Sequence, residues 1–201
     1  MTRFSPRHSW TVLVLAGCFV AGSAFAADEP HAHVHGLAEM TVAVDANQLS
    51  ITLDSPLDSL LGFEHAPGND AQKQAVRQLS QRFSQPLALF VTPAAAGCVV
   101  SSSSVSAPVI DMALGDAKAS SASTPKADAH AGHADHDDGG AQHGDLDAAF
   151  VFTCRTPASL TSLAVQLFDG FPGMRQINVQ VAGPKGQSAV RLTPQQRNVS
   201  W

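Results

Sequence analysis

The chain has 201 residues, with 17 acidic and 12 basic side chains and a formal net charge of -5 at pH 7. This length suits a single domain, and 44% apolar residues fit a globular protein, although the share of charged residues, 14%, is unusually small. The composition argues against a nucleic-acid-binding role, because phosphate contacts need clustered Lys and Arg, whereas the basic residues here are scattered. The nine histidines are the unusual feature of the composition.

Residues 1–26 have the anatomy of a secretory signal peptide. Arg3 and Arg7 precede an apolar run from Trp10 to Val20, and Ala24 to Ala26 form a small-x-small cleavage site. We therefore expect a mature chain of residues 27–201. No other apolar stretch reaches the ~18 residues needed to span a bilayer, so no membrane span is expected.

A second interpretation of the N-terminus stays open. Leu15 to Cys18 resembles a bacterial lipobox, in which the cysteine is acylated and anchors the protein to a membrane. The apolar segment continues through Cys18 to Ala26, which favours ordinary cleavage over lipid anchoring.

Cleavage after Ala26 leaves two cysteines, Cys98 and Cys154, in an oxidising compartment. A single disulfide between them is the expected outcome, and two buried free thiols are the alternative.

The hydrophobic pattern predicts an α+β fold, mainly antiparallel β-sheet with one principal helix. Alternating apolar residues in 39–44 and 49–53 predict a hairpin, and helical spacing predicts a helix over about 70–84 that begins at Asn69 or Asp70 and stops before Pro86. Further strands are predicted at 98–104, 148–155 and 163–168, with both Cys98 and Cys154 facing inward. A second hairpin is predicted over 177–192, with its turn at Gly183 to Gly186.

Residues 115–145 contain no Val, Ile, Leu, Met or aromatic side chain. Such a segment cannot bury enough apolar surface to order itself, so it is predicted to be a disordered, His/Asp-rich insertion. Strand-like sequence and the two cysteines lie on both sides of it. The insertion therefore interrupts one domain, residues 27–201, and does not separate two.

The histidines gather in two tracts. The first tract directly follows the signal and consists of His31, His33 and His35. The second tract lies in the insertion and consists of His130, His133, His136 and His143, and Asp135 adds an oxygen donor to it. Residues i and i+2 of an extended chain project to one side, so the first tract can offer several imidazoles to one ion. Imidazole with carboxylate suits Zn(II) best, with Ni(II) or Cu(II) as competitors.

Two other functions are alternatives to metal binding, namely an interaction domain and an enzyme. The insertion could be a solvated linker with idle histidines, in which case the protein would be a structural or interaction domain of the cell envelope. No nucleophile elbow, His-Glu-x-x-His or phosphate-binding loop is present, so we expect no enzyme activity, although distant residues of a metallohydrolase would escape such motifs.

Several segments resemble the ZrgA family of bacterial zinc-uptake proteins, and they occur in order along nearly the whole mature chain. These are His31 to Gly36, Ser55–Pro56, Gly62 to Pro67, Ala96 to Cys98, the His/Asp-rich insertion, Phe152 to Cys154 and Phe168 to Gly173. Gly62 to Pro67 is the most specific of them, since His-rich tracts occur in many unrelated proteins.

The resemblance implies a periplasmic protein of a Gram-negative bacterium that binds zinc and assists its uptake, with a zinc transporter component as partner. It also implies that Glu64 and His65 belong to an ordered metal site near the N-terminal histidines. The residues themselves leave His65 open as an ordinary loop or capping histidine.

Overall fold

The computed structural model describes residues 34–114 and 144–201. The predicted signal peptide and most of the predicted insertion lie outside these ranges. The described elements, in chain order, are β1 (Leu37–Asp45), β2 (Gln48–Pro56), α1 (Leu57–Leu61), α2 (Asp70–Phe83), α3 (Pro86–Leu89), β3 (Phe90–Val91), η1 (Ala94–Ala96), β4 (Cys98–Ser106), α4 (Pro108–Leu114), β5 (Asp145–Cys154), η2 (Pro157–Ser159), β6 (Ser162–Val165), α5 (Leu167–Gly170), β7 (Gln176–Gly183), β8 (Gly186–Leu192) and β9 (Asn198–Ser200).

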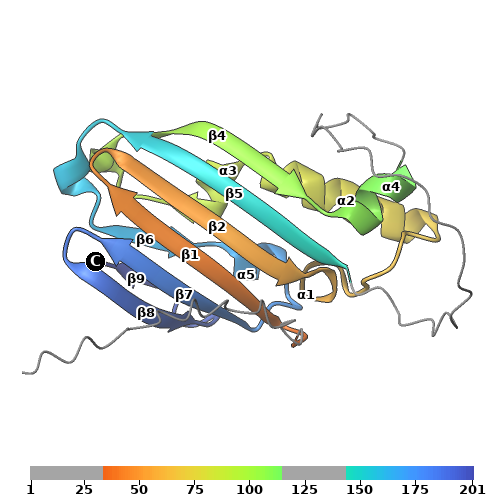
Figure 1. Ribbon diagram of the computed structural model, residues 1–201. Coiled ribbons are helices and arrows are strands. Elements are labelled where there is room, and N and C mark those ends of the chain that lie inside the picture. The colour runs from red at the N-terminus through yellow and green to blue at the C-terminus, as the bar shows by residue number, and fades with distance from the viewer. Residues whose placement is uncertain (1–33, 115–143) are drawn as a thin grey trace, which may run out of the picture. The chain divides into compact units, whose positions relative to one another are not determined.

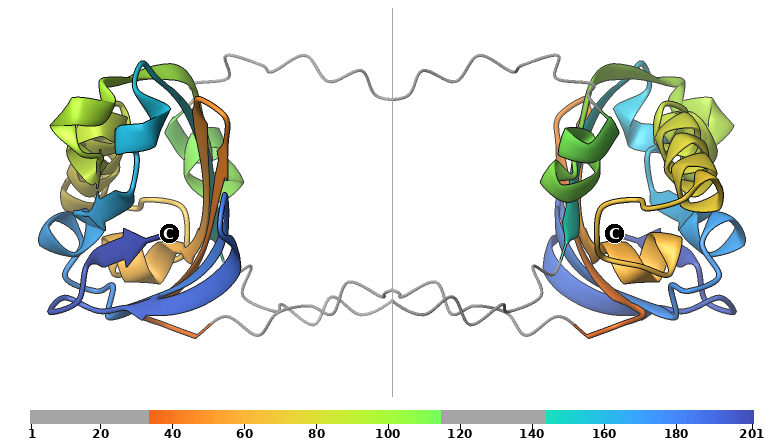
Figure 2. Two further views of the ribbon diagram at one scale, coloured as in Figure 1. Left: turned by 90° about the vertical axis from the view of Figure 1, so that its left-hand side faces the viewer. Right: turned by 90° about the vertical axis from the view of Figure 1, so that its right-hand side faces the viewer.

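The main layer is a six-stranded sheet in the order β4-β5-β2-β1-β7-β8. Every pairing in it is antiparallel except that of β1 with β7, which is parallel. A smaller sheet, β3-β6-β9, lies with α2 and α3 on one side of the large sheet (Figures 1 and 2). The fold is therefore α+β with a mainly antiparallel sheet, as the sequence predicts.

The hydrophobic core fills the space between these two layers. Alternate residues of the central strands face it, among them Ile51 and Phe150, which are completely buried. From the other side, α2 contributes Phe83, whose ring centroid lies 6.4 Å from that of Phe150 and 5.7 Å from that of Phe171. Burying a Phe side chain contributes about 1.5–3 kcal/mol, so this aromatic cluster is a main support of the fold.

The principal helix agrees with its prediction. α2 begins after Asn69, whose side-chain oxygen accepts a hydrogen bond of 3.0 Å from the Gln72 amide and so caps the helix. The helix ends at Phe83, and Pro86 then starts the short helix α3. The buried residues of α2 are Val76, Leu79 and Phe83, which follow the helical spacing used in the prediction.

One predicted strand is partly wrong. The sequence predicts a strand over 163–168, but β6 ends at Val165 and residues 167–170 form α5. Leu167 and Phe168 are buried from this helical turn. Apolar residues in a short run satisfy either conformation, which is why periodicity misassigns the second half.

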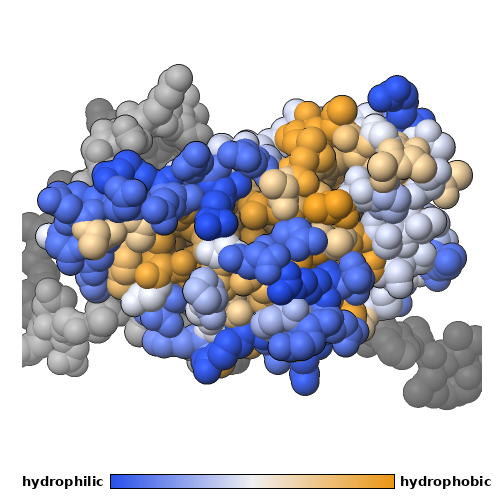
Figure 3. All heavy atoms as spheres, turned by 180° about the vertical axis from the view of Figure 1, so that it is seen from behind, coloured by the Kyte–Doolittle hydropathy of each residue, from blue (hydrophilic) through white to orange (hydrophobic). Residues whose placement is uncertain are grey.

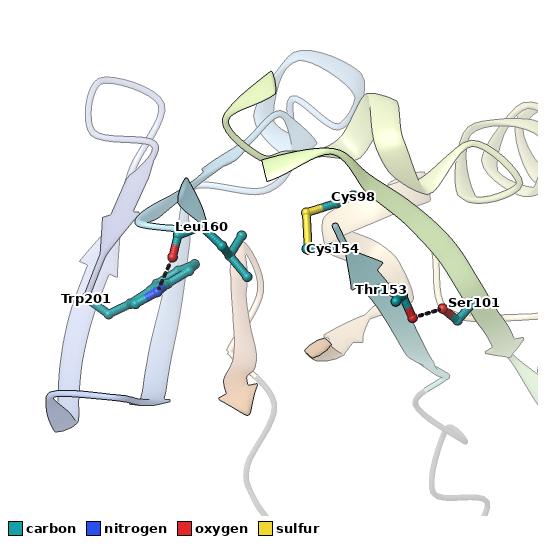
Figure 4. The surroundings of a disulfide bond; sticks show 6 residues. All are labelled: Cys98, Ser101, Thr153, Cys154, Leu160 and Trp201. Atoms are coloured by element: carbon teal, nitrogen blue, oxygen red, sulfur yellow. Dashed lines mark hydrogen bonds between the residues drawn. A yellow bond between two sulfur atoms is a disulfide. The ribbon is translucent and has the colours of Figure 1, made fainter. Parts of the chain in front are cut away.

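The predicted disulfide is present between Cys98 and Cys154 (Figure 4). The two cysteines are directly paired residues of β4 and β5, with 3.9 Å between their Cα atoms. Beside them, the Ser101 and Thr153 hydroxyls share a hydrogen bond of 2.6 Å. The disulfide joins the edge strand β4 to the neighbouring strand β5, where Cys154 is buried and only 1% exposed.

The surface carries exposed apolar side chains as well as polar ones. Seen from behind, hydrophobic side chains gather in several patches (Figure 3). Among the described residues, the large apolar side chains that are exposed come from the start of the described chain and from α3, β3 and β4, namely Val34, Leu87, Val91, Val99, Val100 and Val105. None of the described helices is long and apolar enough to cross a membrane.

Candidate metal centre

His35 lies between two carboxylates at one end of the large sheet. Its Nδ1 atom is 3.2 Å from Asp58 Oδ2, and its Nε2 atom is 3.3 Å from Glu64 Oε1. The ring is half exposed, whereas the Glu64 side chain is 15% exposed. The histidine can therefore be reached from solvent while its acidic neighbours are partly enclosed.

The short helix α1 supplies one of these carboxylates and fixes the chain beside the histidine. Asp58 lies in its first turn, and the buried Ser59 accepts a hydrogen bond of 2.8 Å from the Gly36 amide. Consecutive residues of α1 thus hold the side chain of His35 and the backbone of Gly36. Gly62 then ends the helix in a left-handed conformation and leads into the loop that carries Glu64.

A second segment holds the same stretch of chain from its other side. The Gly36 carbonyl accepts hydrogen bonds from the Arg175 and Gln176 amides, at 2.8 and 2.9 Å. The Arg175 guanidinium donates to the His35 carbonyl at 2.7 Å. Because Gly36 has a φ of +84° and a Cβ there would overlap Arg175 Nε, only glycine fits this position without strain.

The predicted site residues divide into those brought together and those not described. His35 and Glu64 are brought together, with 3.3 Å between His35 Nε2 and Glu64 Oε1. His31, His33, His130, His133, Asp135, His136 and His143 lie outside the described residues. The predicted insertion is described only at its end, where β5 begins at Asp145.

His65 makes other contacts. Its Nδ1 atom lies 2.8 Å from the Ala66 carbonyl oxygen, and its ring centroid lies 5.3 Å from that of Phe63. A carbonyl oxygen can only accept, so Nδ1 carries the proton in this contact, and the Nε2 lone pair of the neutral ring is left for another partner. His65 is therefore a loop histidine with a local hydrogen bond, and it directly follows Glu64 in the chain.

Sequence reasoning missed Asp58. Within residues 34–114 and 144–201, no group of three or more His, Cys, Asp or Glu side chains is arranged to hold a metal ion. The two nitrogens of one imidazole point in different directions, so Asp58 and Glu64 cannot share a single ion with His35. The only sequence signal for Asp58 is Pro56 ahead of a short acidic helix start, which marks a helix but no ligand.

Carboxylates also cross the outer face of the sheet at this end. Glu39 of β1 is paired with Asp54 of β2, which is paired in turn with Asp147 of β5. Asn178 donates a hydrogen bond of 2.7 Å to Glu39. Like charges placed directly opposite in a sheet are unfavourable to each other, and they make the surface attractive to cations.

The end of the insertion meets the site. The carbonyl of Gly144, which directly follows His143, accepts a hydrogen bond of 2.8 Å from the Leu57 amide. A Cβ on Gly144 would lie 2.7 Å from the Glu64 carbonyl oxygen, so the two backbones are in close contact. The histidine-rich insertion therefore rejoins the domain against the residue that faces His35.

Comparison with known proteins identifies the family of the chain. No curated protein matches the chain. Residues 32–201, nearly the whole expected mature chain, match the family described as ZrgA family zinc uptake protein. The chain therefore belongs to the ZrgA family of zinc uptake proteins.

Proposed function

We propose that the protein captures Zn(II) in the periplasm through its two histidine tracts and passes the ion to a component of a zinc transporter. The observation that supports this proposal is that the two points where the tracts join the described domain lie at one place. The first tract ends in His35, which contacts Glu64, and the second ends in His143, whose neighbour Gly144 packs against the Glu64 backbone.

Strand directions support this meeting. β1 starts where the N-terminal tract ends, and β5 starts where the insertion ends. β2 is antiparallel to both strands, so its far end, followed by α1 and the Glu64 loop, lies at the start of β1 and β5. Joining ligands to one region raises their effective concentration to the millimolar range for short flexible connections.

The donor types match zinc better than softer or harder ions. Imidazole and carboxylate bind Zn(II) at about 2.0–2.2 Å, and nickel or copper can compete for the same donors. Cu(I) is a poorer match, because Cys98 and Cys154 are joined in a disulfide and cannot act as thiolate ligands. Capture and release require no catalysis, so the protein is proposed to be a binding protein and not an enzyme.

Secretion suits the same role. The predicted signal over residues 1–26 directs the chain out of the cytoplasm, and the disulfide fits an oxidising compartment. Zinc-uptake membership makes the periplasm of a Gram-negative bacterium the natural place for capture before transport.

The test is a calorimetric zinc titration of residues 27–201, compared with a variant in which His130, His133, His136 and His143 are changed to Ala. We expect the variant to bind fewer ions and to retain binding at the ordered domain. Nickel and copper titrations measure selectivity. If zinc binds no better than to a scrambled peptide of equal histidine content, the proposal is wrong, and an envelope interaction domain with an incidental His-rich linker becomes the better explanation.

A further inference from the structure

We propose that Glu64 and the Nε2 atom of His35 are two ligands of one zinc ion in the ordered site. Asp58 is a positioning residue that orients the His35 ring without touching the ion. This inference rests on the proposed function, since it assigns roles within the same zinc site. It adds a residue, Asp58, that neither sequence reasoning nor family membership identifies.

The spacing between His35 and Glu64 fits two ligands of one tetrahedral ion. With metal-ligand bonds of about 2.0–2.2 Å, neighbouring donors of a zinc tetrahedron lie roughly 3.3–3.5 Å apart. The distance from His35 Nε2 to Glu64 Oε1 is 3.3 Å. One zinc ion can therefore bind to both His35 Nε2 and Glu64 with little movement of either side chain.

The position of Asp58 suits orientation. Metal-ligating histidines commonly donate their second ring N–H to a carboxylate, which fixes the ring and its tautomer. Asp58 Oδ2 lies 3.2 Å from His35 Nδ1, at the other nitrogen of the same ring. With the Nδ1 proton directed at Asp58, the lone pair of the neutral ring is on Nε2, facing Glu64.

The surroundings decide which carboxylate has which role. Asp58 sits on α1, and the next residue of that helix, Ser59, binds the Gly36 backbone, so Asp58 is fixed relative to the His35 main chain. Glu64 follows the Gly62 helix end and stands in a loop next to His65. The Glu64 side also adjoins Gly144, where the second histidine tract joins the domain.

Charge supports the same assignment. Asp58 and Glu64 together carry two negative charges beside one neutral imidazole, which balances a divalent cation. A carboxylate need not contact the ion to balance its charge, so Asp58 can stabilise the bound cation electrostatically from behind the His35 ring.

The experiment uses residues 27–201 with the four insertion histidines changed to Ala, referred to as the insertion-silenced chain. Zinc affinity is measured by competition with a chelator for this chain and for its Asp58→Asn, Asp58→Glu and Glu64→Gln variants. Asp45→Asn is the matched control, because Asp45 is an exposed carboxylate at the opposite end of β1. Long-range proton–nitrogen NMR spectra of His35 show which ring nitrogen binds the metal.

We expect Asp58→Asn to weaken zinc binding by about 10- to 100-fold, the usual effect of losing a carboxylate behind a metal-bound histidine. Asp58→Glu restores part of this loss, Glu64→Gln weakens binding more than Asp58→Asn does, and Asp45→Asn leaves it unchanged. The NMR signature is metal on Nε2 in the parent chain, with signals from both nitrogens in Asp58→Asn.

Metal on Nδ1 in the parent chain, or a larger loss from Asp58→Asn than from Glu64→Gln with both variants folded by circular dichroism, overturns the assignment. Zinc binding by the full mature chain but none by the insertion-silenced chain also overturns it, while the proposed function stands. Absence of binding in both chains overturns both.

Discussion

Changing Gly36 to Ala tests whether the chain beside His35 is held as the structure indicates. Gly36 adopts a φ of +84°, and a Cβ there would overlap Arg175 Nε and lie 3.1 Å from the Gly173 carbonyl oxygen. Arg175 therefore has to move, and its hydrogen bond of 2.7 Å to the His35 carbonyl is lost.

The expected cost has two parts. A left-handed conformation costs an L-residue roughly 1–2 kcal/mol. Displacing Arg175 adds the loss of an exposed charged hydrogen bond and a steric term, together about 1–2 kcal/mol. We expect the free energy of unfolding to fall by about 2–4 kcal/mol, and zinc affinity to fall as well, because His35 is the residue directly before Gly36.

Urea unfolding of residues 27–201 with linear extrapolation measures this change. Gly62→Ala is the matched control, because Gly62 has a φ of +78° and nothing lies within 4 Å of its added Cβ. The control should lose only the conformational term of about 1–2 kcal/mol. If Gly36→Ala costs no more than Gly62→Ala, the contacts between Arg175 and the His35 segment contribute nothing, and the reasoning is refuted.

Three further changes probe other parts of the structure. Gly144→Ala places a Cβ 2.8 Å from Leu57 Cδ1, so we expect a loss of about 1–3 kcal/mol in urea unfolding, and an unchanged midpoint would show that this junction adapts freely. Replacing Cys98 and Cys154 with Ser should lower stability by about 2–4 kcal/mol in a thermal melt, whereas equal melting of wild type with and without reductant would contradict a stabilising role for the disulfide. Asn69→Ala removes the cap of α2 and should cost about 1 kcal/mol, and Asn69→Asp, which keeps the acceptor, should cost little by the same urea assay.

Local patterns predicted the elements whose signals are local. The first hairpin alternates with period two, and α2 combines a capping residue with helical spacing, so both were found with nearly correct bounds. Of the small sheet β3-β6-β9, only β6 was found, as the first part of the strand predicted over 163–168; β3 and β9 have two and three residues, from which no alternation can be read. The parallel pairing of β1 with β7 joins residues about 140 positions apart, for which a single sequence carries no pairing signal.

The candidate site shows the same division. His35 and Glu64 were named from histidine spacing and family resemblance. Asp58 escaped notice because its role depends on where α1 lies relative to the chain entering β1, which follows from the sheet register and from the Ser59 contact to Gly36. An aspartate in the first turn of a short helix is ordinary by composition, since acidic residues favour helix N-termini for electrostatic reasons alone.

The arrangement of strands explains why the segments that carry the candidate metal ligands join the domain at one end of the sheet. The starts of β1 and β5 and the end of β2 must share one end, because β2 is antiparallel to both neighbours. Each of these points is where a chemically active segment joins the domain: the first histidine tract at β1, the insertion at β5, and α1 with the Glu64 loop at β2. An insertion at the opposite end of β5 would carry the same histidines but would join the domain about 30 Å away, given a rise of about 3.3 Å per residue over a ten-residue strand. The position of the insertion in the topology, and not its composition alone, therefore determines that it rejoins the domain next to Glu64, which faces His35.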